Sequence, residues 1–294
     1  SWVPNKSGPW DYGLYATSSS SDGLNFNSGT LLLDHAGVPN LVQTSAGRLI
    51  LTFQYFSYED EELFDVIAYM ISNDDGKTWT EPKAISYTGL PAAQKGSKPV
   101  DPTLVQLEDG TFRLYFTYHE STEDYSHVSS ATAKSINKPF KYENVRLRSS
   151  SYSELEANLL DPAIIFFNGK YHYYAPKPGG GSVLNLHATS ENGLDFDVED
   201  DVSVEVNFFG NPVLFKNKVR FYGSTGGLGS EPVVSALSSD GSNFTKDSGN
   251  RSHGFDPAIV KLREKMFSKK SSRLKQKIIK SLFERFTKKS KKSI

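Results

Sequence analysis

The chain has 294 residues, of which 37% are hydrophobic and 13% aromatic, and it contains no cysteine. This length suffices for one large domain or two small ones with a substantial core, and the missing thiols exclude disulfides and thiolate metal sites. The formal net charge of −1 is unevenly divided, because residues 263–294 carry 13 Lys and Arg against two Glu. We therefore expect an acidic body at 1–262, net charge −12, followed by a basic tail of +11.

The sequence contains no apolar run near the roughly 20 residues that a membrane-spanning helix needs. It begins at Ser1 rather than Met, which is compatible with a removed leader. We expect an exported or cell-surface protein.

A short pattern of an acid or amide, a proline and an apolar run recurs along the chain. The copies are Gly37-Val38-Pro39-Asn40-Leu41-Val42, Val100-Asp101-Pro102-Thr103-Leu104-Val105, Asp161-Pro162-Ala163-Ile164-Ile165, Gly210-Asn211-Pro212-Val213-Leu214 and Phe255-Asp256-Pro257-Ala258-Ile259-Val260. Their prolines are 63, 60, 50 and 45 residues apart. A four-stranded propeller blade takes about 40–50 residues, so five copies predict five similar units, some with longer loops.

Each unit also repeats internally. A turn follows the proline strand and leads to a second strand rich in aromatic and β-branched residues, as at 112–117. A third strand then ends in a polar hairpin at 20–26, 72–79, 190–196 and 238–244, where Asp or Asn binds backbone amides and Gly takes a positive φ. The second unit, ending near Lys138-Pro139-Phe140, lacks this hairpin.

The two ends of the chain complete each other. The first hairpin precedes the first proline pattern, and the last proline pattern has no hairpin after it. Residues 12–26 would then supply outer strands to a blade whose inner strand is 255–262, which closes the ring and removes sheet edges. We predict an all-β fold, a five-bladed β-propeller at 1–262 closed by N- and C-terminal strands.

The Ser-x-Asp-x-Gly-x-Thr-Trp hairpin at 72–79 resembles the Asp-box, or BNR repeat, of sialidase propellers. The Asp-Pro strands resemble the inner strands of five-bladed arabinanase and β-xylosidase-type glycoside hydrolases. The resemblance covers about residues 10–262 and implies a sialidase-like, carbohydrate-active hydrolase. In such proteins the Asp-box is a structural turn at the blade periphery.

Carboxylates at the starts of the inner strands are the candidate catalytic groups. In a propeller these starts converge at one mouth of the channel, and a proline holds the preceding residue extended. We expect Asp34, Asp101 and Asp161 to form an acid, base and pKa-tuning set, because like charges brought together split their pKa values. The other interpretation, an inner-strand cap repeated by duplication, stays open, since Asn211 occupies the same slot and cannot titrate.

The arabinanase-type pattern implies a base Asp in the first blade, a second Asp in the next blade and an acid Glu in the third. Asp101 matches the second element, and Asp34 lies five residues before its proline. Asp161 stands where that family has Glu, with Glu154 and Glu156 as substitutes upstream.

A sialidase mechanism would instead need three arginines around a carboxylate, a Tyr-Glu pair and an Asp acid. Arg113 and Arg220 occupy matching strand positions. This match favours a structural role for both.

Further polar and aromatic residues lie next to the predicted mouth and are candidates for substrate binding. They are His35, His119, Glu120, Asp256 and Tyr174. A histidine can act as general acid, base or hydrogen-bond donor to a sugar, and a tyrosine ring can stack on one. No spacing matches a zinc-protease motif, a calcium loop or a P-loop, so we expect no cofactor and no metal, although an ion held by the channel acids stays an alternative.

The tail at 263–294 breaks the blade pattern and has the period of an amphipathic helix. Its apolar arc comprises Leu274, Ile278, Ile279, Leu282, Phe283 and Phe286. A basic helix of this kind can bind an anionic membrane surface or an acidic partner, and we expect no specific nucleic acid. A solvated extension, or a helix docked on the acidic body, stays open as well.

The sequence thus predicts a glycosidase that acts on a carbohydrate at the channel mouth. The alternative is a non-catalytic propeller that binds a glycan or protein and uses the tail as an anchor. Convergence of the three predicted acids within about 5–10 Å around an open pocket would favour the enzyme.

Overall fold

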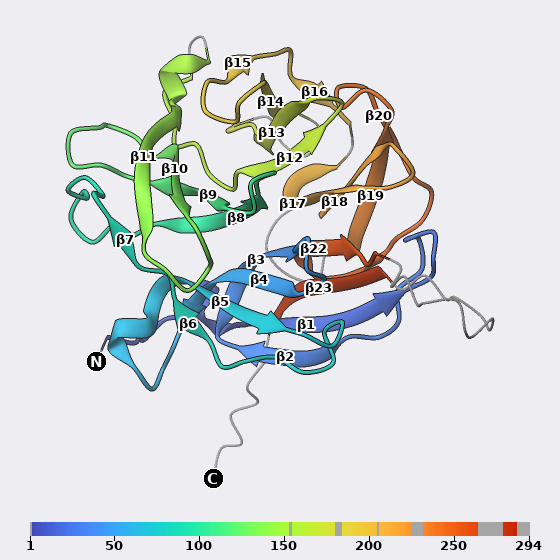
Figure 1. Cartoon of the computed structure of the whole chain (residues 1–294), viewed down its shortest axis with the longest axis horizontal. Coiled ribbons are helices and arrows are strands. Elements are labelled where there is room, and N and C mark those ends of the chain that lie inside the picture. Colours follow the sequence, from blue (N-terminus) through green and yellow to red (C-terminus); the bar gives the residue numbers. More distant parts are fainter. Residues whose placement is uncertain are drawn as a thin grey trace.

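The computed structural model describes residues 2–152, 155–179, 184–204, 206–224, 232–263 and 279–286. The regular secondary structure of these ranges is almost entirely β-strand, with three 3-10 helices at Pro9–Asp11 (η1), Glu61–Leu63 (η2) and Ser149–Ser151 (η3). The sheets are arranged around a common centre like the blades of a propeller (Figure 1). The prediction of an all-β propeller is confirmed. Across the described ranges, none of the helices has the length and apolar character needed to cross a membrane.

The described strands form five sheets, each running from an innermost strand outward. Sheet I contains β3 (Ala36–Gln43), β4 (Leu49–Phe56), β5 (Phe64–Ser72) and β6 (Lys83–Ala84). Sheet II contains β8 (Val100–Gln106), β9 (Phe112–Tyr118), β10 (His127–Ala133), β11 (Phe140–Leu147) and β7 (Tyr87–Thr88). Sheet III contains β12 (Ala163–Phe167), β13 (Lys170–Pro176) and β14 (Leu184–Ser190), with β15 (Asp197–Val198) and β16 (Val202–Ser203) both paired to β14. Sheet IV contains β17 (Asn207–Leu214), β18 (Val219–Ser224) and β19 (Pro232–Ser238), with β20 (Phe244–Lys246) and β21 (Ser252–His253) both paired to β19. Sheet V contains β22 (Phe255–Lys261), β23 (Ile279–Phe286), β1 (Tyr12–Ser19) and β2 (Thr30–Asp34).

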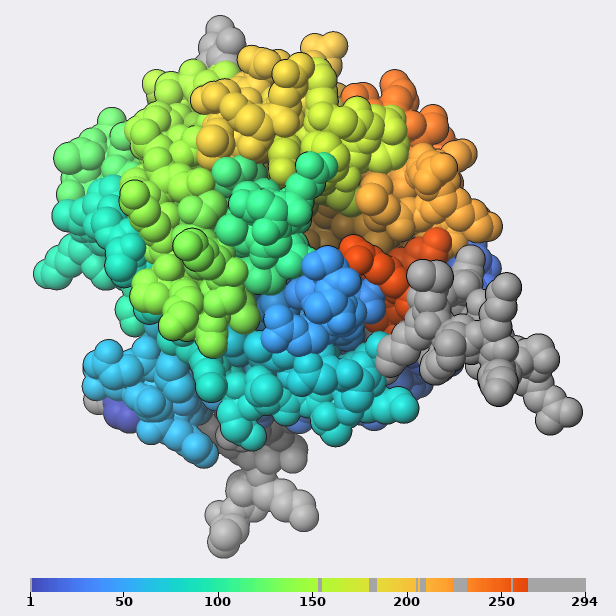
Figure 2. All heavy atoms as spheres, in the orientation of Figure 1, coloured from blue at the N-terminus to red at the C-terminus, as the bar shows by residue number. Residues whose placement is uncertain are grey.

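The innermost strands form a closed ring, in which β3, β8, β12, β17 and β22 each contact the next and β22 contacts β3. Their later residues, among them Val105, Ile165 and Leu214, line a channel. This channel opens as a hollow near the centre of Figure 2.

The core lies between neighbouring sheets rather than in one central mass. One apolar cluster joins Ile50 and Ile67 of sheet I to Leu114 and Phe116 of sheet II. Because both faces of a middle sheet are covered, its strands read as continuous apolar or aromatic runs, and all of β9 is buried. This explains why the second strand of each unit stands out in the sequence.

Sheet V joins the two ends of the described chain. Strand β23 lies between β1 and β22, with Tyr12 opposite Phe286, Ser19 opposite Ile279, and Lys261 opposite Ile279. The N-terminal strands and the last proline strand therefore share one sheet. Ring closure by strands from both ends is confirmed.

The helix predicted for the tail is wrong at residues 279–286, which form strand β23. The apolar arc suggested a helix, but β1 and β22 would otherwise leave two unpaired edges, and tertiary pairing overrides local periodicity. Ile and Phe, frequent in this segment, also favour strands. Residues 264–278 and 287–294 lie outside the described part of the chain, so the division at 262/263 stays a prediction there.

The polar hairpin after β5 is built on one carboxylate. Asp74 Oδ1 accepts hydrogen bonds from the amides of Lys77 (3.0 Å) and Thr78 (2.9 Å) and from Ser72 Oγ (2.8 Å). The bonds from Thr78 and Ser72 hold the pKa of Asp74 well below its usual range. The matching turn after β19 uses Asp240 in the same way.

Three of these hairpins dock on the sheet that precedes them in the ring. In each case a tyrosine on the second strand of that sheet donates its hydroxyl proton to the carbonyl of the hairpin glycine. The pairs are Tyr115 with Gly193 (2.8 Å), Tyr174 with Gly241 (2.5 Å) and Tyr222 with Gly23 (3.0 Å). A Cβ at Gly193 would lie 2.6 Å from the Tyr115 hydroxyl, so the approach requires glycine.

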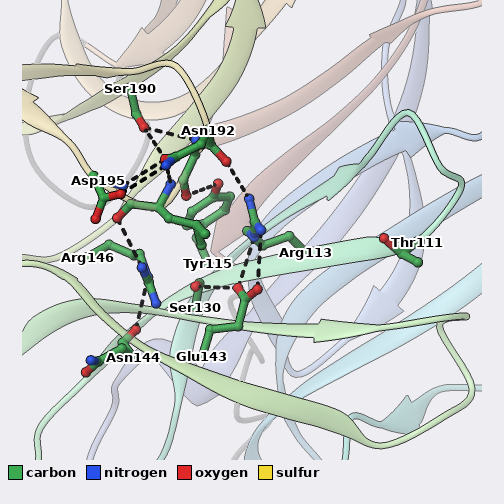
Figure 3. Close-up of polar contacts among 12 residues, drawn as sticks. Thr111, Arg113, Tyr115, Ser130, Glu143, Asn144, Arg146, Ser190, Asn192 and Asp195 are labelled. Carbon is green, nitrogen blue, oxygen red and sulfur yellow. Dashed lines mark hydrogen bonds and ion pairs between the residues drawn. The ribbon is translucent and has the colours of Figure 1, made fainter.

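Arginine reinforces two of these contacts. Arg113 donates to the Asn192 carbonyl (3.0 Å) and forms a two-pronged ion pair with Glu143, at 2.9 and 3.2 Å (Figure 3). Arg220 likewise donates to the Asp22 carbonyl and pairs with Asp247 at 3.0 Å. The structural interpretation of both arginines is confirmed.

The junction between sheets I and II lacks this polar contact. The corresponding positions of β4 hold Ile50 and Thr52, and the turn after β10 lacks the hairpin motif. Ile136 of that turn instead belongs to the same apolar cluster as Ile50. Where the hairpin is absent, the residues that would bind it are absent too.

We expect Tyr115→Phe to lower the free energy of unfolding by about 1–2 kcal/mol, because the Gly193 carbonyl loses a buried donor. Thr52→Val is the matched control, since the buried Thr52 hydroxyl has no hydrogen-bond partner within the described ranges. Its stability should be unchanged or higher. Urea denaturation of both variants measures the difference, and equal stabilities would contradict the docking role of Tyr115.

We expect deletion of residues 263–294 to abolish cooperative folding, because β1 and β22 would lose the strand between them. Thermal melting and size-exclusion chromatography measure this loss. Deletion of 287–294 alone keeps β23 and is expected to leave the protein folded. An unchanged melting temperature after the longer deletion would show that β23 is dispensable.

Candidate active site

The starts of the inner strands meet at the narrow end of the channel. The residues before the prolines there include three acids, Asp101, Asp161 and Asp256, together with Val38 and Asn211. Asp101 and Asp256 are buried. The space between these residues is about the size of one water molecule.

The backbone turns these acids toward the channel by an unexpected conformation. The proline rule predicts an extended residue before each proline, but φ is 54° at Asp101, 54° at Asp161 and 51° at Asp256. In β8 the ladder passes from Val100 to Thr103, which leaves the Asp-Pro pair as an irregularity, and β22 has the same break. A bulge of this kind re-aims a side chain, and Asp tolerates the left-handed region better than most residues.

Asp101 and Asp161 form a coupled pair of carboxyl groups. The amide of Asp161 donates to Asp101 Oδ2 at 3.3 Å. Burial raises the pKa of Asp101, against the opposing effect of the Thr117 hydroxyl. Burial, then the charges of Asp101 and Asp256, raise the pKa of Asp161 well above its usual value. The pair therefore retains a proton at pH values where a free aspartate is ionised.

Asn211 precedes the proline of sheet IV, and its amide side chain links two sheets. Its Nδ2 donates to the Pro39 carbonyl (3.0 Å), and its Oδ1 accepts from Asn40 Nδ2 (2.5 Å). Asn40 Oδ1 in turn accepts from the Leu104 amide (3.0 Å). A carboxylate could not donate to Pro39, so the amide ties sheet IV to sheet I and explains the uncharged slot.

Asp34 does not line this cavity. It ends β2, and its carboxylate lies 3.7 Å from His35 Nε2 with 40% of the side chain exposed. The His35 ring stacks on Tyr58, with centroids 3.8 Å apart, and its Nδ1 lies 2.7 Å from the Trp10 carbonyl. Val38, not Asp34, occupies the sheet I slot beside the other predicted acids.

His119 and Glu120 lie at the end of β9 in sheet II. His119 Nε2 contacts the Glu123 carbonyl at 2.9 Å. Glu120 Oε1 accepts the Tyr142 hydroxyl at 2.6 Å and lies 3.3 Å from His127 Nε2. Both are therefore engaged within sheet II, and neither lines the acid cavity.

The prediction that Tyr174 stacks on a sugar is wrong. Its side chain is fully buried, its hydroxyl is bound to Gly241, and its ring is stacked at 5.0 Å on His187. Tyr174 does lie on the second strand of its sheet, but it faces the next sheet rather than the channel.

Sequence reasoning missed two features of the site. The first proline pattern already shows Val38 where the others show an acid or amide, and this substitution signals a missing carboxylate. Asp65, whose charge adds to the raised pKa of Asp101, follows no repeat signal. Across the described ranges, no group of three or more His, Cys, Asp or Glu side chains is placed to hold a metal ion.

No protein-family model matches the chain, and no curated protein matches its sequence. Several solved structures do match. An α-L-arabinofuranosidase from Clostridium thermocellum is 16% identical, with a TM-score of 0.58 over 78% of this chain and 79% of that one. A family 117 glycoside hydrolase from Zobellia galactanivorans is 15% identical, with a TM-score of 0.54 over 94% and 91%.

A Hadza microbial sialidase is 12% identical, with a TM-score of 0.51 over 78% of this chain and only 50% of that one. At these identities the likeness concerns the fold. The chain is similar to propeller glycoside hydrolases and to a sialidase propeller, as its motifs predicted.

We expect Asp161→Asn to stabilise the protein at neutral pH. A raised pKa means that the folded state binds protons more tightly than the unfolded state, so the free energy of unfolding falls as pH rises above about 4. The amide removes this loss, and Asn also tolerates a positive φ.

The gain in the free energy of unfolding should be near zero at pH 4 and reach about 1–3 kcal/mol at pH 8. This is the range for removing one unfavourable buried polar group. Urea denaturation across this pH range measures it. Asp109→Asn, at an exposed turn whose aspartate has a lowered pKa, is the control and should show no such gain. A gain for Asp161→Asn that is independent of pH would contradict the raised pKa.

Proposed function

We propose that this protein is a glycoside hydrolase whose reaction takes place on the Asp101–Asp161 pair at the narrow end of the channel, once the water-sized space there has widened to admit the glycosidic bond. The observation that carries the proposal is that Asp101 and Asp161 lie side by side at the starts of neighbouring inner strands, line one small cavity and are joined by the bond from the Asp161 amide to Asp101 Oδ2. Glycoside hydrolysis needs one carboxyl group that keeps its proton and a second that is ionised.

The two acids differ in their surroundings, which supports different roles. Asp161 faces both Asp101 and Asp256, whose charges favour its protonated form. We assign it as the acid that gives its proton to the departing glycosidic oxygen. Asp101, which accepts the Asp161 amide, is then the ionised partner that acts on the anomeric carbon, either directly or by taking a proton from water.

We also propose a finer description of the fold. We interpret each of the five sheets as one propeller blade, and the hairpins built on Asp74 and Asp240 as Asp-box turns. The closed ring of inner strands and the repeated side-chain bonds of the hairpins support this interpretation.

The substrate class is a carbohydrate. The similar structures include an α-L-arabinofuranosidase, a β-xylosidase and a sialidase, so arabinofuranosides, xylosides and sialosides are the first compounds to test. His35, His119 and Glu120 remain candidates for contacts with the more distant part of a substrate.

The test is a screen of aryl α-L-arabinofuranosides, β-xylosides and sialosides with the wild type and single variants. We expect Asp101→Asn and Asp161→Asn each to lower kcat/KM by about 10²–10⁴-fold, the usual contribution of one acid or base. Asp34→Asn makes the same change at a carboxylate outside the cavity and should stay active. A wild type that binds glycans but cleaves none would favour the non-catalytic alternative.

A further inference from the structure

Sheet I contributes no charge to the ring of inner-strand residues. Its slot holds Val38, with φ 48°, where sheets II, III and V hold aspartates. A β-branched residue with a positive φ is strained, so the inner-strand irregularity persists in sheet I although its acid is gone. The cluster of Asp101, Asp161 and Asp256 therefore receives a carboxylate from sheet I only if another strand of that sheet supplies it.

Asp65 is placed by a bulge on the third strand of the same sheet. Tyr55 pairs with Val66 and Phe56 pairs with Phe64, so Asp65 is the extra residue that the ladder passes over. Its φ of 56° lies in the left-handed region, as at the inner-strand acids. Bulges occur next to active sites, where they re-aim a side chain.

The side chain of Asp65 is bound within sheet I, and the backbone beside it is bound to the segment that leads into sheet II. Gln54 Nε2 donates to Asp65 Oδ1 at 2.5 Å, and Gln54 sits opposite Gly37, the neighbour of Val38. Lys98, just before β8, donates its Nζ proton to the Phe64 carbonyl at 2.8 Å. The Lys98 bond and the contact between β5 and β8 place the Asp65 segment next to the strand that carries Asp101.

We propose that Asp65, held by Gln54, is the sheet I carboxylate of the reaction centre and acts as a positioning residue through Asp101. This inference rests on the proposed function. It replaces the acid missing from the inner strand of sheet I by one from the third strand.

The electrostatics agree with this placement. The groups that act on Asp101 are Asp161 from sheet III, Thr117 from β9 and Asp65 from β5, with Asp256 acting on Asp161. The charge of Asp65 adds to the rise in the pKa of Asp101 that burial causes. Asp65 therefore adds to the effect of burial and shifts the ionisation of Asp101 to higher pH.

The test is the titration of Asp101 in the full chain with ¹³C-carboxyl-labelled aspartate, followed by NMR. The Asp101 signal is identified by its loss in Asp101→Asn. In Asp65→Asn the pKa of Asp101 should fall, because the ionised form no longer faces a like charge, and Asn keeps both the shape and the tolerance of a positive φ. An Asp101 titration that is the same in wild type and Asp65→Asn would overturn the proposal.

Glu62→Gln is the matched control, because it removes an equal charge from an exposed position in the same loop. It should leave the Asp101 titration unchanged, and an equal shift in this variant would show that loop charge, not Asp65, is responsible. Gln54→Ala should shift the titration in the same direction as Asp65→Asn, because Asp65 loses its anchor. No shift in Gln54→Ala would contradict the anchoring role.

A second readout uses whichever aryl glycoside the protein cleaves. Asp65→Asn should move the ascending limb of the pH profile of kcat/KM to lower pH and lower its maximum by about tenfold or more. A merely structural role would lower activity without moving the limb, which would count against the proposal. If no glycoside is cleaved, the proposed function fails, while the NMR titration still decides whether Asp65 acts on Asp101.

Discussion

The fold depends on the pairing of β23 with β1 and β22, because this pairing closes the ring. A ring of radially arranged sheets leaves only short edges, and each inner strand takes its position from the two sheets beside it. The acids of sheets II, III and V come from residues far apart in the sequence, and they meet only when the ring is complete. Closure by the chain ends is therefore a condition for the site as well as for stability.

Within that ring, the residue before the proline of each inner strand has different roles in different sheets. The irregular position before the proline presents a carboxylate in sheets II, III and V and an apolar side chain in sheet I, whereas Asn211 of sheet IV pairs regularly with Tyr222 and forms an amide crosslink. The backbone geometry is shared by these four sheets, and the side chain and its surroundings decide the chemistry. Bringing three carboxyl groups together is unfavourable to the fold when all of them are ionised, because like charges repel.

The repeats in the sequence predicted the all-β fold, the ring closure and the hairpin positions, because turns and strand periodicity are local properties. Register is not local, and the errors follow from that. Asp34 lies close to its proline in the sequence, but it ends β2 of sheet V, and Val38 of sheet I is the residue that reaches the cavity.

Tyr174 and residues 279–286 show the same limit. An aromatic strand residue can face a ligand or the next sheet, and an apolar segment can be helix or strand, depending on which partner it meets. The positive φ of Val38, Asp101, Asp161 and Asp256 could not be predicted, because it runs against the local preference of a residue that precedes proline.

The docking of hairpin glycines on tyrosines also gives the ring an order. Two junctions bear Tyr and Arg facing a hairpin carbonyl, one bears Tyr174 with His172, and one is apolar, with Ile50 facing the turn of Ile136. At each of these junctions, the side chains on the second strand of one sheet therefore match the turn of the sheet that follows it. If sheets II and III exchanged places, the tyrosine of one unit would meet a turn without a glycine carbonyl, and Ile50 would meet a polar hairpin. The interfaces therefore join neighbouring sheets and also favour one order of the sheets around the ring.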